Sequence, residues 1–145
     1  MNLSVHNMNL VTTILTFFVS IHLFSQEYLP RSSGEVIKHT YYALSYNETH
    51  EQANWVYYKL DPTFLNGRSP RKNNFREDPY VSSYSATLND YKGSGYDRGH
   101  LAPAGDMKFN SIAMSESFYM SNISPQKPEF NRGIWRRLES LVRAW

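Results

Sequence analysis

Residues 95–110 read GYDRGHLAPAGDMKFN, and this stretch decides both the fold class and the candidate site of the 145-residue chain. Gly99 and Pro103 lie four residues apart, which makes the stretch a poor helix. Asp97 and Arg98 are adjacent charged residues, and charged residues are rarely placed in a buried strand. The pattern therefore predicts that His100 closes a short strand and is presented to a site rather than to a core.

The composition is typical of one ordinary globular domain, with 41% hydrophobic and 15% aromatic residues. The net charge of +2 does not by itself indicate a nucleic-acid ligand. Cysteine is absent, which excludes disulfides, thiolate metal sites and a cysteine nucleophile. The C-terminal segment is rich in arginine, and such a segment suits either an anionic partner or a solvated helix face.

The N-terminal segment contains an apolar run, LVTTILTFFVSIHLF at residues 10–24, without Lys, Arg, Asp or Glu. The run is shorter than the roughly 20 residues of a membrane span and fits the hydrophobic region of a secretory signal. Ser25 is a suitable small residue before a cut, although Leu23 is not small and no Lys or Arg precedes the run. We predict a signal peptide over residues 1–25, cleaved after Ser25, and a secreted or periplasmic domain over residues 26–145. An uncleaved membrane anchor is the alternative.

Local patterns predict an alternation of strands, loop and helices. Residues 36–46 and 54–60 are rich in β-branched and aromatic residues and are predicted to pair as a hairpin. Residues 61–95 are predicted to be mostly loop, with interleaved basic and aromatic residues that either bind phosphates and bases or are simply solvated. Residues 110–116 are predicted to be helical and 117–121 extended. A final helix is predicted to reach the C-terminus, with an apolar stripe that packs in the core: Ile134, Leu138 and Leu141.

Two polar residues share one face of that final helix. Asn131 and Glu139 are eight positions apart, which places them on neighbouring parts of the face and about 12 Å from each other. Asn131 stands in the first turn, where an asparagine is also a candidate helix cap.

Three motifs follow one another along the chain: DRGHLAPAGDM at 97–107, SNISPQ at 121–126, and N-x-x-x-W-x-x-LE from Asn131 to Glu139. In this order they resemble the sugar-non-specific DNA/RNA endonucleases, a group that includes secreted bacterial nucleases and mitochondrial endonuclease G. The resemblance covers residues 36–145. It implies an α+β fold in which a ββα-metal (His-Me) finger lies on a partial antiparallel sheet. Because the family's domain continues beyond the LE helix, the resemblance also implies a domain that is incomplete at its C-terminus.

The resemblance implies Mg²⁺-dependent hydrolysis of DNA and RNA with little sequence preference, leaving 5′-phosphate and 3′-hydroxyl ends. His100 is implied as the general base, and a neutral imidazole suits that role near pH 7. Asn131 is implied to hold one divalent ion, usually Mg²⁺, with Mn²⁺ or another divalent ion as the alternative. Glu139 would hold the waters of that ion.

Arginines are implied around the phosphate, because a guanidinium can grip two phosphate oxygens at once. The predicted catalytic residues are His100, Arg98, Glu139 and Arg143, and the predicted substrate-binding residues are Arg71, Arg98, Asn122 and Arg143. Arg71 is the weaker match among the arginines, and Asn122 is predicted to position the chain more than to take part in the chemistry. Asp97 is predicted to fix the turn around His100, while His39 and His50 match no motif and are predicted to be structural or surface residues.

DNA and RNA are the predicted partners, with no stable membrane association once the signal is removed; a homodimer and an inhibitor protein are left open. Two alternatives to the enzyme stay open. One is an inactive nucleic-acid-binding remnant that keeps the arginines without the geometry. The other is a membrane-anchored half of a split nuclease, in which the stripe on the final helix lacks its cover and requires a partner.

Overall fold

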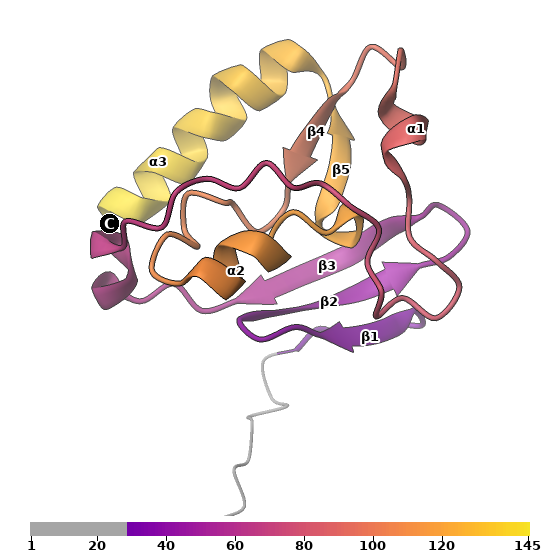
Figure 1. The fold of residues 1–145 in the computed structure, drawn as a ribbon, viewed down its shortest axis with the longest axis horizontal. Coiled ribbons are helices and arrows are strands. Elements are labelled where there is room, and N and C mark those ends of the chain that lie inside the picture. Colours follow the sequence, from indigo (N-terminus) through magenta and orange to yellow (C-terminus); the bar gives the residue numbers. More distant parts are fainter. Residues whose placement is uncertain (1–28) are drawn as a thin grey trace, which may run out of the picture.

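Two small antiparallel sheets and the helices around them make up the α+β fold of the computed structural model, which describes residues 29–145 (Figure 1). The first sheet has the order β1-β2-β3, and the second pairs β4 with β5. The strands are β1 (Glu35–Lys38), β2 (Tyr42–Asn47), β3 (Gln52–Tyr58), β4 (Asp97–His100) and β5 (Ile123–Gln126). The helical elements are η2 (Pro62–Asn66), α1 (Leu88–Tyr91), α2 (Ser111–Glu116), η3 (Met120–Asn122), the π-helical η4 (Phe130–Trp135) and α3 (Arg136–Ala144).

The predicted signal peptide and its cleavage after Ser25 lie outside the described residues. Within residues 29–145, none of the helices has the length and apolar character that crossing a membrane requires.

The predicted hairpin is confirmed, since β2 and β3 pair antiparallel. The single strand predicted over residues 36–46 is wrong, because the chain turns there and forms β1 and β2, which pair with each other. The turn is closed by the His39 amide, which donates to the Tyr42 carbonyl at 2.8 Å. The His39 side chain is fully buried, with Nε2 3.0 Å from Asp78 Oδ2, so a buried polar contact interrupts a run with strong β propensity.

Asp78 belongs to a buried polar cluster that ties the first sheet to the loop above it. Its carboxylate accepts from the Ser121 hydroxyl at 2.5 Å and from the Tyr80 amide at 2.9 Å. Burial raises the pKa of Asp78, but the His39 and Ser121 contacts outweigh burial and leave that pKa below its ordinary value of 3.8. The ionised form of Asp78 is therefore favoured in the folded chain.

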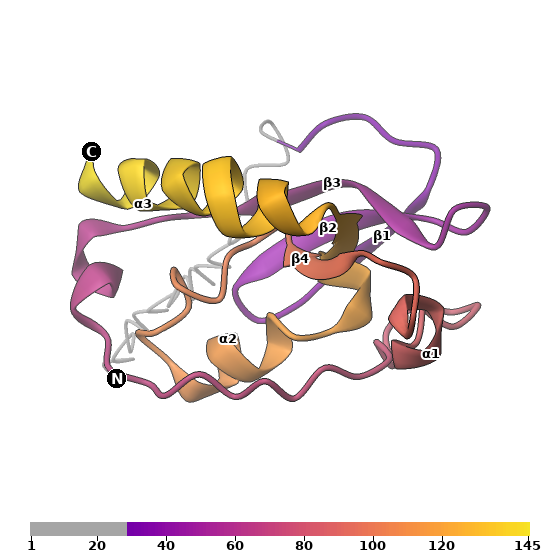
Figure 2. The same cartoon turned by 90° about the horizontal axis from the view of Figure 1, so that it is seen from above.

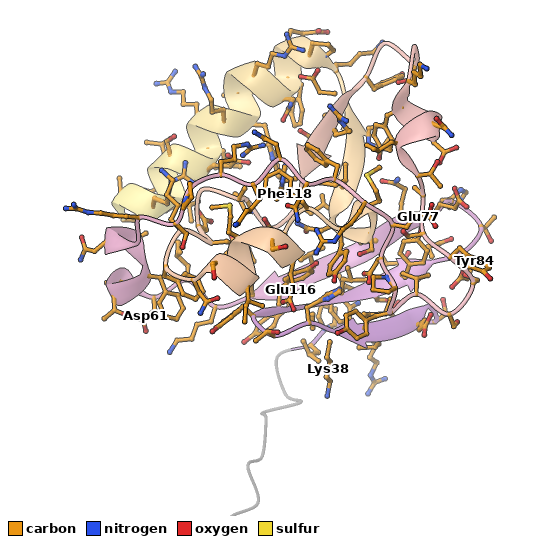
Figure 3. All side chains as sticks on the ribbon, viewed as in Figure 1. Lys38, Asp61, Glu77, Tyr84, Glu116 and Phe118 are labelled. Carbon is orange, nitrogen blue, oxygen red and sulfur yellow. The ribbon has the colours of Figure 1, made fainter. Side chains whose placement is uncertain are left out.

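The core lies between the first sheet and the segments that cross it. One buried cluster joins β1 and β2 to Val81, and another joins Met114 and Phe118 to Ala104, with Phe75 packed against it. Glu116, labelled in Figure 3 at the end of α2, accepts from the amide and hydroxyl of Thr40 at 3.0 and 2.8 Å. These contacts fix α2 against the turn between β1 and β2.

The predicted helix at 110–116 is confirmed, because α2 begins after Asn110, whose side chain accepts from the Ile112 and Ala113 amides. The extended segment predicted at 117–121 is wrong. A turn and η3 occupy those residues. The Ser117 hydroxyl donates a hydrogen bond to the Met114 carbonyl, and the Met120 amide donates one to the Arg76 carbonyl. This reversal returns the chain so that β5 can lie beside β4.

The sequence β4, β5 and final helix forms the expected ββα arrangement. His100 lies opposite Ile123 and Asp97 lies opposite Gln126, so β4 ends where the SNISPQ motif begins its strand. A Cβ on Gly99 would overlap the buried Gln126 side chain, so a larger residue at position 99 requires that side chain to move.

The apolar stripe on the final helix is exposed, and the prediction that it packs in the core is wrong. Ile134 is 61% exposed, Leu138 43% and Leu141 44%. Figure 2 shows α3 along one long side of the molecule, with the segment that connects η2 to α1 along the other. The C-terminal helical segment is attached through other side chains: Trp135 Nε1 donates to the His100 carbonyl at 3.1 Å.

Candidate active site

His100 ends β4 in an almost closed aromatic environment and is only 7% exposed. Its ring packs edge-on against Phe118, with centroids 4.8 Å apart, and lies 5.6 Å from Phe75. Burial, with a smaller effect of the positive charge on Arg71, lowers the pKa of His100 to about 3. The imidazole is therefore neutral at pH 7, and its Nε2 is buried without a hydrogen-bond partner. A neutral ring nitrogen of this kind can accept a proton or a hydrogen bond from a ligand.

An open cleft of about 600 Å³ lies beside β4. Three of its lining residues are basic (Arg71, Lys92 and Arg98), while Asp97 is the one acidic residue in the lining. The remaining lining residues are polar or apolar: Asn73, Phe75, Leu88, Asn89, Tyr91, Tyr96 and Asn131. Basic and aromatic side chains on one wall suit a ligand with phosphate groups and flat rings.

The structure brings some predicted site residues into this cleft and leaves others outside it. Arg71, Arg98 and Asn131 line the cleft, whereas His100, Glu139 and Arg143 do not. His100 is nevertheless adjacent, because Phe75 both lines the cleft and contacts the imidazole. Phe75 is therefore shared between the cleft and the surroundings of His100.

Both cleft arginines rest on aromatic rings. The guanidinium of Arg98 lies 4.4 Å from the Phe75 ring centre, and that of Arg71 lies 4.9 Å from the ring centre of Phe118. Phe118 is fully buried and is labelled in Figure 3 in the interior of the molecule. Arg71 also donates from Nε to Asn73 Oδ1 at 2.7 Å. These contacts pre-orient both cations without neutralising them.

Asn131 does not cap the final helix. It lies within η4, where the helix is kinked at Gly133, and its Nδ2 donates to Asp97 Oδ2 at 3.0 Å. The same carboxylate receives two bonds from Arg132, at 2.7 Å from Nε and 2.6 Å from Nη2. Hydrogen bonds from Arg132 and then from Asn131 lower the pKa of Asp97. Asp97 therefore ties η4 to β4, which differs from its predicted role of fixing the turn around His100.

Glu139 and Arg143 form a second group on α3. Arg143 Nη1 lies 2.5 Å from Asp106 Oδ1, and the Asp106 side chain is 1% exposed. Asp106 also accepts from the Tyr58 hydroxyl at 2.8 Å, which links α3 to β3. Burial raises the pKa of Glu139, while the nearby charges of Arg143 and Arg71 oppose that rise and Asp106 adds to it. Arg71 thus acts on both His100 and Glu139 and is the electrostatic link between the two groups.

Asn122 is fully buried and has a structural role. Its Nδ2 donates to the carbonyls of Ala102 and Ser117 at 3.0 and 2.9 Å, and its Oδ1 accepts from the Ala102 amide at 2.8 Å. The positioning role predicted for Asn122 agrees with these contacts. Its inclusion among the substrate-binding residues does not, because no polar atom of the side chain is left to face a ligand.

Several residues of the site were not found from the sequence. Arg132 forms an ion pair with Asp97, the carboxylate that also binds Asn131, and Asp106 forms an ion pair with Arg143. The two members of each pair lie 35 and 37 residues apart in the chain, respectively. Phe75 was predicted only as one of the loop aromatics that either stack on bases or are solvated, although its ring both contacts His100 and lines the cleft. In residues 29–145 no three or more His, Cys, Asp or Glu side chains gather where they could share a metal ion.

Comparison with known proteins agrees with the motifs. A model of the DNA/RNA non-specific endonuclease family matches residues 20–145. The mitochondrial nuclease EXOG of Danio rerio is 47% identical over 117 residues, which make up 79% of this chain and 34% of that protein. Human mitochondrial endonuclease G is 42% identical over 105 residues, which are 71% of this chain and 35% of that protein.

The fold has a solved counterpart in the crystal structure of the EndoG/EndoGI complex, described as the mechanism of EndoG inhibition. The match has a TM-score of 0.72 and 35% sequence identity, and it covers 78% of this chain and 48% of the other. The chain thus spans between a third and a half of the length of the relatives it matches. By sequence and by fold, the chain belongs to the DNA/RNA non-specific endonuclease family.

Proposed function

We propose that the chain carries the catalytic finger of an endonuclease that hydrolyses phosphodiester bonds of DNA and RNA with little sequence preference. The proposed products carry 5′-phosphate and 3′-hydroxyl ends, and the proposed cofactor is Mg²⁺, with Mn²⁺ or another divalent ion as the alternative. The observation that carries the proposal is a neutral, buried imidazole with an unpartnered Nε2 beside a cleft that presents two arginines and Asn131.

His100 is proposed as the general base. Its neutral form can take the proton of an attacking water, and Nε2 has no competing partner in the folded chain. A pKa of about 3 is too low for an efficient base at pH 7. Burial is the main cause of the low pKa, and a phosphodiester bound beside Arg71 would counter only the smaller effect of that positive charge, so substrate binding would raise the pKa of His100 in part.

Asn131 is proposed as the protein ligand of the divalent ion. Its Nδ2 is bound to Asp97, which leaves the amide oxygen for a hard cation that keeps most of its water. Such an ion would supply positive charge at the phosphate and the leaving oxygen. Glu139 is proposed to hold water on that ion, and its partly buried carboxylate lies within the electrostatic reach of Arg71 and Arg143.

Arg71 and Arg98 are proposed to bind phosphate in the cleft, and Arg143 is proposed to reach the scissile group from α3. Both arginines line the cleft, and neither guanidinium is paired with a carboxylate in residues 29–145, so both can make charge-assisted bonds to phosphate. Recognition through phosphate does not depend on base identity, which supports weak sequence preference.

Nucleic-acid binding without cleavage is the second candidate. Two observations favour it: His100 is not among the residues that line the cleft, and Arg143 is already paired with Asp106. In this case the basic cleft would bind an anionic strand, while the catalytic groups would not reach it.

One experiment decides between the two candidates. The chain is incubated with plasmid DNA and with RNA, in Mg²⁺ or in EDTA, and His100→Ala is compared with His50→Ala, a change at an exposed histidine. Loss of both substrates only with Mg²⁺, abolished by His100→Ala and kept by His50→Ala, supports the endonuclease. Salt-sensitive gel shifts without metal-dependent cleavage support binding alone.

We also propose that the protein is exported and cleaved after Ser25, on the strength of the apolar run at residues 10–24. Mass spectrometry of the expressed protein tests this, since a mature N-terminus at Gln26 is expected in the soluble fraction. An intact N-terminus in the membrane fraction would instead support the anchor.

A further inference from the structure

Two consecutive residues of η4 grip one carboxylate of β4. Asn131 donates from Nδ2 to Asp97 Oδ2 at 3.0 Å, and Arg132 donates from Nε and Nη2 to the two oxygens at 2.7 and 2.6 Å. The Arg132 side chain itself is 71% exposed, so its bidentate pair with Asp97 lies at the surface. The site is thereby held together across 34 residues of sequence by three hydrogen bonds.

The chemistry of this contact fixes the orientation of the Asn131 amide. An ionised carboxylate only accepts hydrogen bonds, so it must face the NH₂ group of the amide and not the oxygen. The amide oxygen of Asn131 is therefore turned away from Asp97, and both residues line the cleft. An asparagine without such a partner could rotate its amide and present either end.

Arg132 stabilises the contact between Asp97 and Asn131 in two ways. A bidentate guanidinium restrains the Asp97 carboxylate in one plane, and it offsets the negative charge that would otherwise draw a cation onto Asp97 itself. The three bonds occupy both carboxylate oxygens. The Asp97 carboxylate is thus held in the position that orients the Asn131 amide.

We propose that Arg132 and Asp97 are positioning residues that hold the Asn131 oxygen toward the divalent ion and so determine the affinity for that ion. The proposal rests on the proposed function in one respect, the assignment of the ion to Asn131. The positioning account and simple electrostatics give opposite predictions for Arg132. Removing a positive charge near a cation site should tighten cation binding by Coulomb attraction, whereas losing the orienting contact should weaken it.

The test measures Mn²⁺ affinity in the absence of nucleic acid, from the electron paramagnetic resonance signal of free Mn²⁺ during titration of the chain. Arg132→Gln is expected to weaken binding about 10- to 100-fold, as orienting partners of metal ligands do, and Arg132→Lys is expected to restore part of the loss. Arg137→Gln is the matched control, because it removes the same charge from an exposed position of α3, the helix that follows η4; the Mn²⁺ affinity of this variant should stay within about twofold of the parent. Equal or tighter Mn²⁺ binding by Arg132→Gln would overturn the proposal.

A second measurement separates this proposal from the function it rests on. The side-chain ¹⁵N resonance of Asn131 is recorded without metal. Slow exchange of its NH₂ protons with solvent is expected in the parent chain and in Arg137→Gln but not in Arg132→Gln. Unchanged Mn²⁺ affinity in Asn131→Ala would remove the ion from Asn131 and refute the proposed metal site. The amide exchange would still decide whether Arg132 orients Asn131, and unchanged exchange in Arg132→Gln would refute that orientation.

Discussion

Asn122→Ala is expected to lower the free energy of unfolding by about 4 to 6 kcal/mol, because the side chain ties three buried backbone groups together. Its three hydrogen bonds to Ala102 and Ser117 are worth about 1 kcal/mol each. The Ala102 amide, which has no other acceptor within the described residues, would stay buried without a partner and adds about 1 to 3 kcal/mol. Small domains have only about 5 to 15 kcal/mol of stability, so the variant should be close to unfolded.

Urea unfolding of the chain, followed by far-ultraviolet circular dichroism, measures the effect. With a slope of about 1.5 kcal/mol/M, a loss of 4 kcal/mol moves the midpoint by roughly 2.7 M. Asn89→Ala is the matched control, since Asn89 is exposed on α1, and its free energy of unfolding should change by less than about 0.5 kcal/mol. A loss below 1 kcal/mol in Asn122→Ala, together with loss of nucleic-acid binding, would show that Asn122 contacts substrate and would refute the structural role.

Two substitutions and one pH profile test other parts of the structure. Because the pKa of Asp78 is lower in the folded chain than its ordinary value of 3.8, the ionised carboxylate stabilises the fold above pH 3.8, and this stability is lost as the pH falls through the lowered pKa. The melting temperature of Asp78→Asn should therefore fall less between pH 5 and pH 2 than that of the parent chain. Because His100 must be neutral to act as a base and its pKa is about 3 in the free chain, the acid limb of kcat/KM should lie well below 6.5, and a limb at 6.5 would contradict the burial of the ring. Asp106→Asn leaves the partly buried Arg143 without its counter-charge and should cost about 3 kcal/mol in urea unfolding; a cost under 1 kcal/mol would show that the pair is not a tie between α3 and the loop.

Local signals in the sequence were sufficient for much of the fold. The hairpin of β2 and β3, the short strand that ends at His100 and the helix capped by Asn110 each follow from a few adjacent residues. The break between β1 and β2 could not be predicted, because it depends on a contact between His39 and Asp78, which are far apart in the sequence. The exposure of Leu138 was expected only under one alternative, because an amphipathic pattern shows that a helix face is apolar and does not show what covers it.

The candidate site divides in the same way. His100 and Asn131 were identified because their motifs carry them at fixed spacing. Arg132 has no such signal, since an arginine beside Asn131 is indistinguishable in sequence from any other charge on a helix until β4 brings Asp97 to it. The contact between Phe75 and His100 could not be predicted either, because a loop pattern does not show which side chains of the loop face inward.

Gly99 has a consequence for how the motif can vary. The absence of a side chain there leaves room for the Gln126 side chain, because a Cβ at position 99 would overlap its Cγ, Cδ and Oε1 atoms. A larger residue at 99 requires Gln126 to change its conformation or β4 to move, and a displacement of His100 by about 1 Å is enough to slow catalysis a hundredfold. The glycine of DRGH therefore reserves space for the side chain at 126, and a larger residue at 99 is expected together with a shorter or re-oriented side chain at 126.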